Sequence, residues 1–247
     1  WANQGLKRPD TPDVESPIAG GSPIDAFIME GLEHRGLDFP SRADKLTLLR
    51  RASYGLTGLP PTPAQLKQFM ADTEPGAWAR LIDRLLETPQ YGEKWGRHWL
   101  DLVRFAETDS YERDRLKPQA WRYRDWVVNA FNADMPYDLF LLHQLAGDEL
   151  DDPTYASVVA TGFYRLGIWD DEPTDVLQAQ FDDLDSILDV TSRVTLGISM
   201  GCARCHAHKG DPIPHADYYR MLAWFSNIKP YKVGGGNAPT PANYLKQ

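Results

Sequence analysis

Both cysteines of this 247-residue chain lie in one short segment, Cys202-Ala203-Arg204-Cys205-His206. Two residues separate the thiols, and a histidine directly follows the second thiol. This is the spacing of covalent c-type haem attachment, in which two thiols form thioethers to the porphyrin and the adjacent imidazole binds the iron. The segment therefore predicts that Cys202 and Cys205 hold a haem c covalently and that His206 is the proximal ligand of its iron.

Three other chemistries use the same residue types. A thioredoxin-like redox dithiol needs a βαβ context, and none surrounds this segment. A zinc ion could recruit Cys202, Cys205, His206 and His208, although four ligands so close together in sequence crowd one tetrahedral site. A disulfide between Cys202 and Cys205 would be strained. The sequence favours haem attachment and leaves these alternatives open.

The residues beside the motif supply candidates for the rest of a haem site. His208 is two residues beyond His206 and would be directed away from the iron, so we expect it to contact a propionate or to support His206. Haem propionates need cationic donors, and Arg204 lies within the motif itself. Further cationic candidates of the same type are Lys209, Arg122 and Arg124.

A second axial ligand would have to come from elsewhere in the chain. One apolar stripe at helical spacing consists of Trp95, His98, Trp99, Leu102 and Phe105. The stripe predicts that the His98 ring faces the interior, where imidazole is a common iron ligand, so His98 is the first candidate metal ligand after His206. A core histidine that is hydrogen-bonded to a carbonyl is the alternative. His143 ranks second, Met200 or Met221 follow, and an open position is the remaining option.

The elements that must position these residues are all helices. Capping motifs such as Ser22-Pro23-Ile24-Asp25 and apolar stripes at helical spacing recur along the chain, and no alternating strand pattern occurs. The predicted helices cover about residues 22–34, 41–54, 62–69, 78–86, 90–107, 121–131, 137–145, 153–166, 174–199 and 215–228. The predicted fold class is all-α, an irregular multi-helix domain carrying a single covalently attached c-type haem.

The ends of the chain differ from its middle in composition. Residues 1–21 are rich in proline and end in Gly20-Gly21, which predicts an extended arm or linker. Residues 230–247 contain three consecutive glycines and are predicted to be a flexible tail. The helical haem c domain is therefore expected to cover residues 22–229.

Two acidic segments are expected to face solvent. Residues 108–114 lack the glycine and the terminal glutamate of an EF-hand, so a salt-bridged loop is expected there in place of a calcium site. Helix 174–199 carries Asp175, Asp182, Asp183 and Asp185 mostly off its apolar face. They predict a solvated surface, and docking of a basic redox partner is the alternative.

Composition limits the partners and the location. A formal net charge of −9 argues against a nucleic-acid partner, which would require a basic face. No segment approaches the ~18 apolar residues of a membrane span, and the chain begins at Trp1 without a signal peptide. Because this type of haem attachment takes place outside the cytoplasm, we expect a periplasmic or otherwise extracytoplasmic location, with the signal sequence upstream of this chain.

Longer strings of the sequence resemble a known family. They are residues 56–63 (LTGLPPTP), 91–101 (YGEKWGRHWLD), 121–126 (WRYRDW), 132–138 (NADMPYD), 144–148 (QLAGD) and 201–209 (GCARCHAHK). Over about residues 1–225 the chain resembles the planctomycete-type cytochrome C domain, a domain of unknown function in large secreted bacterial proteins. The family usually has Asp and an aromatic residue where this chain has Ala207 and Gly210. The resemblance implies haem and neighbouring domains, but it supplies no activity.

Two functions from different classes follow from these observations. In the first, the chain is a c-type cytochrome domain with one covalently bound haem that transfers electrons within a larger extracytoplasmic protein, to a redox partner or a neighbouring domain. In the second, it is a haem enzyme or a peroxide- or gas-binding domain with an open distal site, where His98, Arg97 or Arg104 acts on the bound species. The attachment motif and the spare histidines favour electron transfer, and whether the chain is an enzyme stays open.

Overall fold

The computed structural model of the chain describes residues 4–5, 7–14 and 22–228. All regular elements in these residues are helices, and the β pairing there is one isolated bridge between Thr108 and Leu116. The predicted all-α class is confirmed, whereas the attached haem remains a prediction. None of the described helices is long and apolar enough to cross a membrane.

The chain divides into two compact units, residues 1–48 and 49–247. The first unit contains α1 (Pro23–Glu33), which begins with the predicted capping box: the Ser22 hydroxyl accepts from the Asp25 N–H, and the Asp25 carboxylate accepts from the Ser22 N–H at 2.7 Å. The predicted arm over residues 1–21 lies partly outside the described residues, and the tail over 230–247 lies wholly outside them. Both therefore stay predictions.

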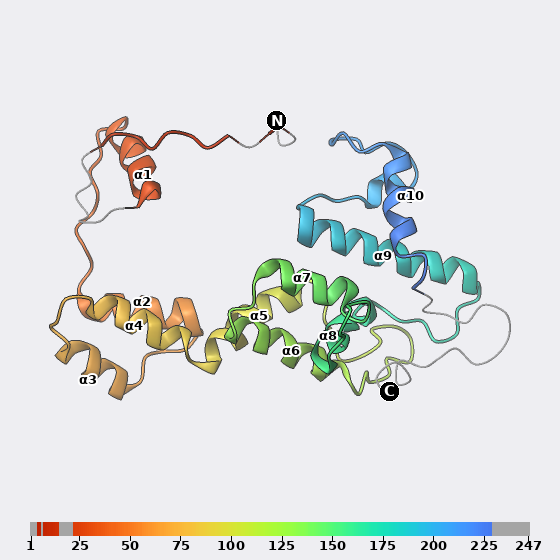
Figure 1. The fold of residues 1–247 in the computed structure, drawn as a ribbon, viewed down its shortest axis with the longest axis horizontal. Coiled ribbons are helices and arrows are strands. Elements are labelled where there is room, and N and C mark those ends of the chain that lie inside the picture. The colour runs from red at the N-terminus through yellow and green to blue at the C-terminus, as the bar shows by residue number, and fades with distance from the viewer. Residues whose placement is uncertain (1–3, 6, 15–21, 229–247) are drawn as a thin grey trace. The chain divides into compact units, whose positions relative to one another are not determined.

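Three short helices form the beginning of the second unit. They are α2 (Lys45–Thr57), whose first residues belong to the first unit, α3 (Pro63–Ala71) and α4 (Ala77–Leu86). Thr62 caps α3 in a capping box with Gln65. Leu49, Phe69 and Leu85 are almost fully buried in the small core of this group, which Figure 1 shows in orange and yellow.

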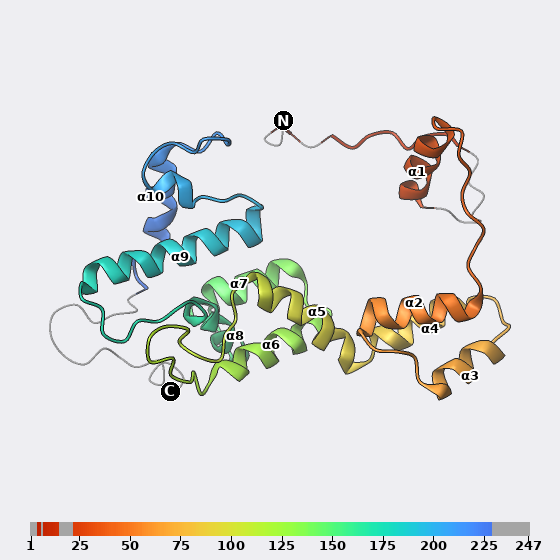
Figure 2. The ribbon, with the colours of Figure 1, turned by 180° about the vertical axis from the view of Figure 1, so that it is seen from behind.

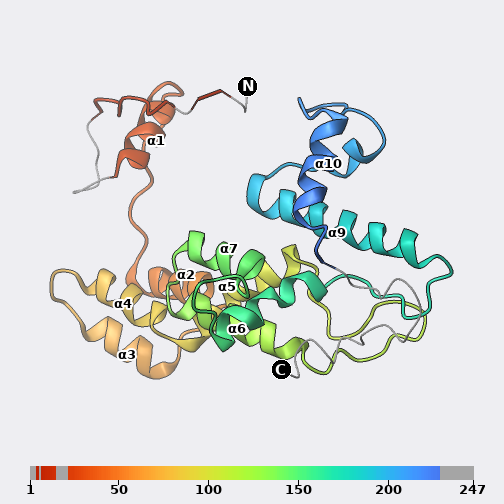
Figure 3. The same cartoon turned by 45° about the vertical axis from the view of Figure 1, so that its right-hand side comes forward.

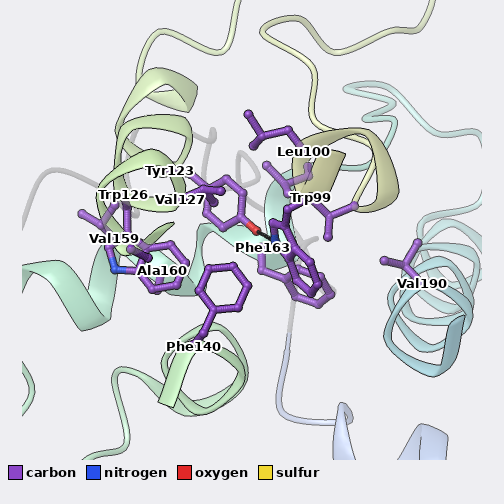
Figure 4. Packing of buried hydrophobic residues seen from close by; sticks show 13 residues of the cluster. Trp99, Leu100, Tyr123, Trp126, Val127, Phe140, Val159, Ala160, Phe163 and Val190 are labelled. Atoms are coloured by element: carbon purple, nitrogen blue, oxygen red, sulfur yellow. Dashed lines mark hydrogen bonds between the residues drawn. The ribbon is translucent and has the colours of Figure 1, made fainter. Parts of the chain in front are cut away.

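The largest core lies among the next helices. It contains side chains from α5 (Pro89–Leu102), α6 (Ala120–Asn132), α7 (Tyr137–Ala146) and α8 (Tyr155–Ala160), and from the 3₁₀ turn η1 (Thr161–Arg165). Figure 4 shows the ring of Phe140 close to two indoles. Its centroid lies 4.9 Å from that of Trp99 and 5.1 Å from that of Trp126. The buried indole N–H of Trp99 donates to Gln144 Oε1 at 3.0 Å, which satisfies a polar group inside this core.

The buried face of α5 differs from the predicted one. Trp95, His98 and Leu102 are exposed, so the prediction that the His98 ring faces the interior is wrong. The buried face instead includes Gly92 and Gly96, together with Trp99, Leu100 and Val103. Because glycine carries only a hydrogen as its side chain, α6 can approach α5 closely at Gly92 and Gly96. A prediction that counts only large apolar residues does not detect this face of the helix. The helix also ends at Leu102, earlier than predicted.

The last helices form a second core. Figures 1, 2 and 3 show α9 (Val176–Leu196) lying between the α5–α8 group on one side and α10 (His215–Trp224) on the other. Val190 of α9 belongs to the first core, whereas Leu188 belongs to the second core, which α9 shares with α10 and with the 3₁₀ segment η2 (Gly201–Arg204). The helix ends at Leu196 and is followed by the C-cap Gly197, whose φ of +66° suits glycine.

Candidate functional site

The two cysteines lie on and just after one turn of 3₁₀ helix. The Ala203 N–H donates to the Met200 carbonyl at 2.9 Å, and the Ala203 side chain is fully buried in the second core. Cys202 and Cys205 are both exposed, and both are free thiols. The turn therefore anchors the residue between the cysteines and presents both sulfurs to solvent.

The imidazole of His206 has one nitrogen engaged and one nitrogen open. Its Nδ1 lies 2.7 Å from the Ala207 carbonyl oxygen. Because a carbonyl oxygen can only accept, Nδ1 carries the proton in this contact and Nε2 keeps its lone pair. A backbone carbonyl that fixes the tautomer in this way is typical of histidines that bind a metal through Nε2. The ring is exposed.

The neighbouring His208 has the opposite arrangement. Its Nδ1 accepts from the backbone N–H groups of Gly210 at 3.2 Å and Asp211 at 2.8 Å, and its side chain is only 11% exposed. Nδ1 also lies 3.4 Å from Asp211 Oδ2, a contact that would need a protonated Nδ1. Because an N–H cannot donate to another N–H, the two backbone N–H groups indicate that Nδ1 carries no proton and that the ring proton is on Nε2. Nε2–H is then a donor, which suits contact with a propionate and leaves no lone pair for a metal.

Arg204 fixes the turn to two helices. Its guanidinium lies 2.8 Å from Asp182 Oδ1 and 3.3 Å from Asp185 Oδ2, both on α9. The hydrogen bond to Asp182 is the main cause that raises the pKa of Arg204. Its carbonyl oxygen accepts from His215 Nε2 and from the Tyr219 hydroxyl, each at 3.0 Å, on α10. Arg204 thus already has carboxylate partners, and its role toward a propionate stays a prediction.

The aspartates of the predicted helix 174–199 form the predicted solvated surface only in part, because Asp175 and Asp182 are exposed whereas Asp183 and Asp185 are half-buried. Asp182 and Asp185 bind Arg204, and Asp189 Oδ1 accepts from the Gly201 N–H at 3.3 Å. Because positions i, i+3 and i+7 share one helix face, these three carboxylates together hold the turn that carries the cysteines. Asp183 faces elsewhere and is partly buried, and burial raises its pKa to about 6.

The candidates for a second axial ligand lie in different places. His98 is exposed beside Trp95, with ring centroids 5.4 Å apart. Figures 1, 2 and 3 show α5, which carries His98, on the opposite side of α9 from η2. His143 is partly buried near Trp126, and its Nδ1 is buried without a hydrogen-bond partner. Met200 and Met221 are buried in the same core as the turn.

The zinc alternative gains no support from this arrangement. Among residues 4–5, 7–14 and 22–228, no three His, Cys, Asp or Glu side chains gather as metal ligands. His34 and His215 are both exposed, as expected from their places at a helix end and a helix start.

Comparison with known families bears on the whole helical region. Residues 23–230 match the profile of the family PSCyt2, described as a protein of unknown function (DUF1549). The chain belongs to this family. The match runs from α1 through α10, so the cysteine turn and the residues that hold it lie within the PSCyt2 region. The predicted resemblance to a planctomycete cytochrome-type domain is therefore confirmed. No curated protein and no solved structure matches the chain.

One group of polar residues in the PSCyt2 domain was missed by sequence reasoning. Arg104, Lys117, Arg165 and Asp183 line a pocket beside α9. They come from three separate segments, the one between α5 and α6, η1 and α9, with no shared spacing, so no motif could have indicated them. The one available signal was the alternation of charges around residues 104–117, and that signal equally describes an exposed loop.

Proposed function

We propose that this chain is a c-type cytochrome domain that holds one haem through Cys202 and Cys205 and transfers electrons within a larger extracytoplasmic protein. When bound, the haem supplies a one-electron iron couple. The observation that carries the proposal is a single turn of chain. It presents two free, exposed thiols, and it is followed by a histidine whose Nε2 is open while its Nδ1–H is donated to the Ala207 carbonyl.

The residues present fit a covalently attached haem. The two thiols are unpaired and accessible, as thioether formation requires. His206 has the tautomer that leaves Nε2 for the iron, whereas His208 does not, so the geometry distinguishes the two histidines of the motif. His206 is therefore the residue assigned to the proximal position, and His208 is assigned to a hydrogen-bonding role through Nε2–H.

The support beneath the turn suits electron transfer. Ala203 is buried, Arg204 is bound by α9 carboxylates and by α10 donors, and the Gly201 N–H is held by Asp189. A ligand mounted on rigid elements keeps its position when the charge of its site changes, and this favours a carrier over a site that must open and close. The net charge of −9 makes a basic redox partner or basic neighbouring domain the complementary donor or acceptor.

The decisive experiment is maturation of the chain in a host that attaches c-type haem. We expect the purified protein to show one haem per chain in a pyridine haemochrome assay and a matching increase in intact mass. The Cys202→Ser/Cys205→Ser double variant should show neither. A wild-type chain that is colourless and weighs no more than its amino acids would overturn the proposal.

Two histidine variants test the ligand assignment. His206→Ala should keep the covalent mass increase but change the visible spectrum, because the proximal ligand is lost. His208→Ala is the matched control two residues away, and its Soret band should stay close to that of the wild type. The same measurement on His98→Ala tests the second axial position, since an unchanged Soret band removes His98 from that position.

Carbon monoxide separates electron transfer from the enzymatic alternative. With both axial positions filled by protein groups, carbon monoxide added to the reduced protein should cause no rapid spectral change. Rapid binding would contradict the electron-transfer assignment and support a domain with an open distal site.

A further inference from the structure

One apolar stripe of α9 is only partly covered by other elements. Four residues at helical spacing share this face of the helix: Leu177, Phe181, Leu184 and Leu188. Leu184 and Leu188 are buried in the second core, together with Ala203 of the cysteine turn and side chains of α10. Leu177 and Phe181 continue the same face, yet they are 56% and 46% exposed. The apolar surface of α9 therefore extends beyond the elements that cover it.

The cysteine turn runs along α9 toward this exposed end of the stripe. The Gly201 N–H contacts Asp189 at 3.3 Å. Three residues later, the Arg204 guanidinium contacts Asp182 at 2.8 Å, about two turns nearer the beginning of the helix. Figures 1 and 2 show the same course, with the chain turning back along α9 after that helix ends. Because Asp182 directly follows Phe181, the segment that carries the thiols approaches the uncovered part of the stripe.

The polar groups between the turn and the stripe satisfy one another. Asp182 Oδ1 accepts from the Arg204 guanidinium and from the Gln178 side-chain amide, the latter at 2.9 Å. An apolar group that covers the exposed part of the stripe would displace water from carbon atoms there, and these polar groups would keep their partners. The cost of burying polar groups without hydrogen bonds is thereby avoided.

The other side of the turn is more polar. There the Arg204 carbonyl accepts from His215 Nε2 and from the Tyr219 hydroxyl, each at 3.0 Å. By contrast, the side chains of Leu177 and Phe181 contain only carbon and hydrogen. Of the two sides, the α9 side therefore offers the more apolar surface.

We propose that Leu177 and Phe181 form the surface on which the haem attached at Cys202 and Cys205 lies. This inference rests on the proposed function. A porphyrin is a large, flat and mainly apolar ring, and its two thioethers would hold it beside the turn at a high effective concentration. Contact with an exposed phenylalanine and an exposed leucine then removes apolar surface of both partners from water.

An apolar surface against the haem also affects its redox potential. Water and polar groups stabilise the oxidised iron, which carries the higher charge, whereas apolar side chains exclude water and favour the reduced form. Leu177 and Phe181 are therefore positioning residues that keep the midpoint potential above that of a more solvated haem.

Hydroxyl-radical footprinting tests the surface without any variant. Phe181 should be modified readily in protein made without the haem-attachment machinery, and it should lose most of this modification once haem is attached. Tyr155 is the internal control, because it is exposed on α8, in the group of helices on the other side of α9, and it should be modified equally in both forms. Equal modification of Phe181 in the two forms would overturn the proposal. Protection of Phe181 already present in the haem-free chain, by another segment or by a second copy, would overturn it too.

Substitution of the two side chains tests their effect on the haem. The Leu177→Asn/Phe181→Asn double variant should keep the covalent increase in mass but have a lower midpoint potential than the wild type. Leu196→Asn is the matched control, since it changes an exposed leucine at the last residue of α9, and its potential should stay that of the wild type. A wild-type potential in the double variant would contradict the proposal.

Failure of this inference is distinguishable from failure of the proposed function. Intact mass reports whether haem is attached, whereas footprinting and the midpoint potential report which side chains cover it. A wild-type chain that gains no mass would refute the haem itself and this surface with it. A chain that gains the mass of one haem but leaves Phe181 unprotected would refute only the surface.

Discussion

The hydroxyl of Tyr218 donates a 2.5 Å hydrogen bond to Asp185 Oδ1, and through it α10 is tied to α9. Burial raises the pKa of this tyrosine, and the hydrogen bond to the Asp185 carboxylate raises it further, so the hydroxyl stays a donor. The other oxygen of Asp185 accepts from Arg204, the residue directly before Cys205. Through Asp185, Tyr218 therefore helps to hold the cysteine turn in position.

Removal of the Tyr218 hydroxyl should destabilise this part of the domain. Tyr218→Phe is expected to lower the free energy of unfolding by about 1.5–3 kcal/mol, the usual range for a hydrogen bond to a charged group. Tyr219→Phe is the matched control, because its exposed hydroxyl donates to a neutral carbonyl, and its loss should cost only about 0.5–1 kcal/mol. Urea denaturation measures both, and equal losses would contradict the role assigned to Tyr218.

The two histidines of the motif should contribute differently to the stability of the chain without haem. In protein made without the haem-attachment machinery, His208→Ala should lower the free energy of unfolding by about 1–2 kcal/mol, because two backbone N–H groups lose their acceptor. His206→Ala should change it by less than about 0.5 kcal/mol, since its ring is exposed. Thermal denaturation of the two variants gives the comparison, and a larger loss in His206→Ala would be inconsistent with this geometry.

Local signals in the sequence were sufficient to predict which segments form helices. The capping box at Ser22 has the predicted contacts, and the structure places a helix in each predicted segment. These signals act within a few residues, so they can be identified without knowledge of the fold. Segment ends were less certain: the predicted helix over 153–166 is α8 followed by a 3₁₀ turn, and the one over 174–199 ends at Leu196.

Buried faces and ion pairs that depend on residues far apart in the sequence could not be predicted. The buried face of α5 is set by α6, which packs against Gly92 and Gly96, and glycine carries no hydrophobic signal. The aspartates of α9 have the composition of a solvated face, yet Arg204, far along the chain, recruits two of them. The cysteine motif was evident because its residues lie close together in the sequence, whereas the support of that motif arises only in the folded chain.

The approach of α6 to α5 makes two glycines differ in their tolerance of a methyl group. At Gly92 a Cβ would lie 2.4 Å from the Val128 carbonyl oxygen, and the backbone there cannot move aside easily. Gly92→Ala should therefore destabilise the protein by about 1–3 kcal/mol. At Gly96 the nearest atoms are valine methyl groups at 3.4 Å, so the helix preference of alanine should leave Gly96→Ala neutral or up to about 1 kcal/mol more stable. Denaturant midpoints that fall equally in both variants would contradict this packing.

The raised pKa of Asp183 should appear in the pH dependence of stability. Between about pH 4 and pH 6 the folded protein keeps the proton that the unfolded chain loses, so the free energy of unfolding should fall as pH rises through this range, by about 2–3 kcal/mol from this group. Asp183→Asn removes this contribution, while Asp109, whose pKa burial also raises, remains in both proteins and cancels in the comparison. The variant should therefore gain stability relative to the wild type as pH rises from about 4 to about 6. Urea denaturation at several pH values measures the difference, and parallel curves would show that the pocket cations keep Asp183 ionised at its ordinary pKa.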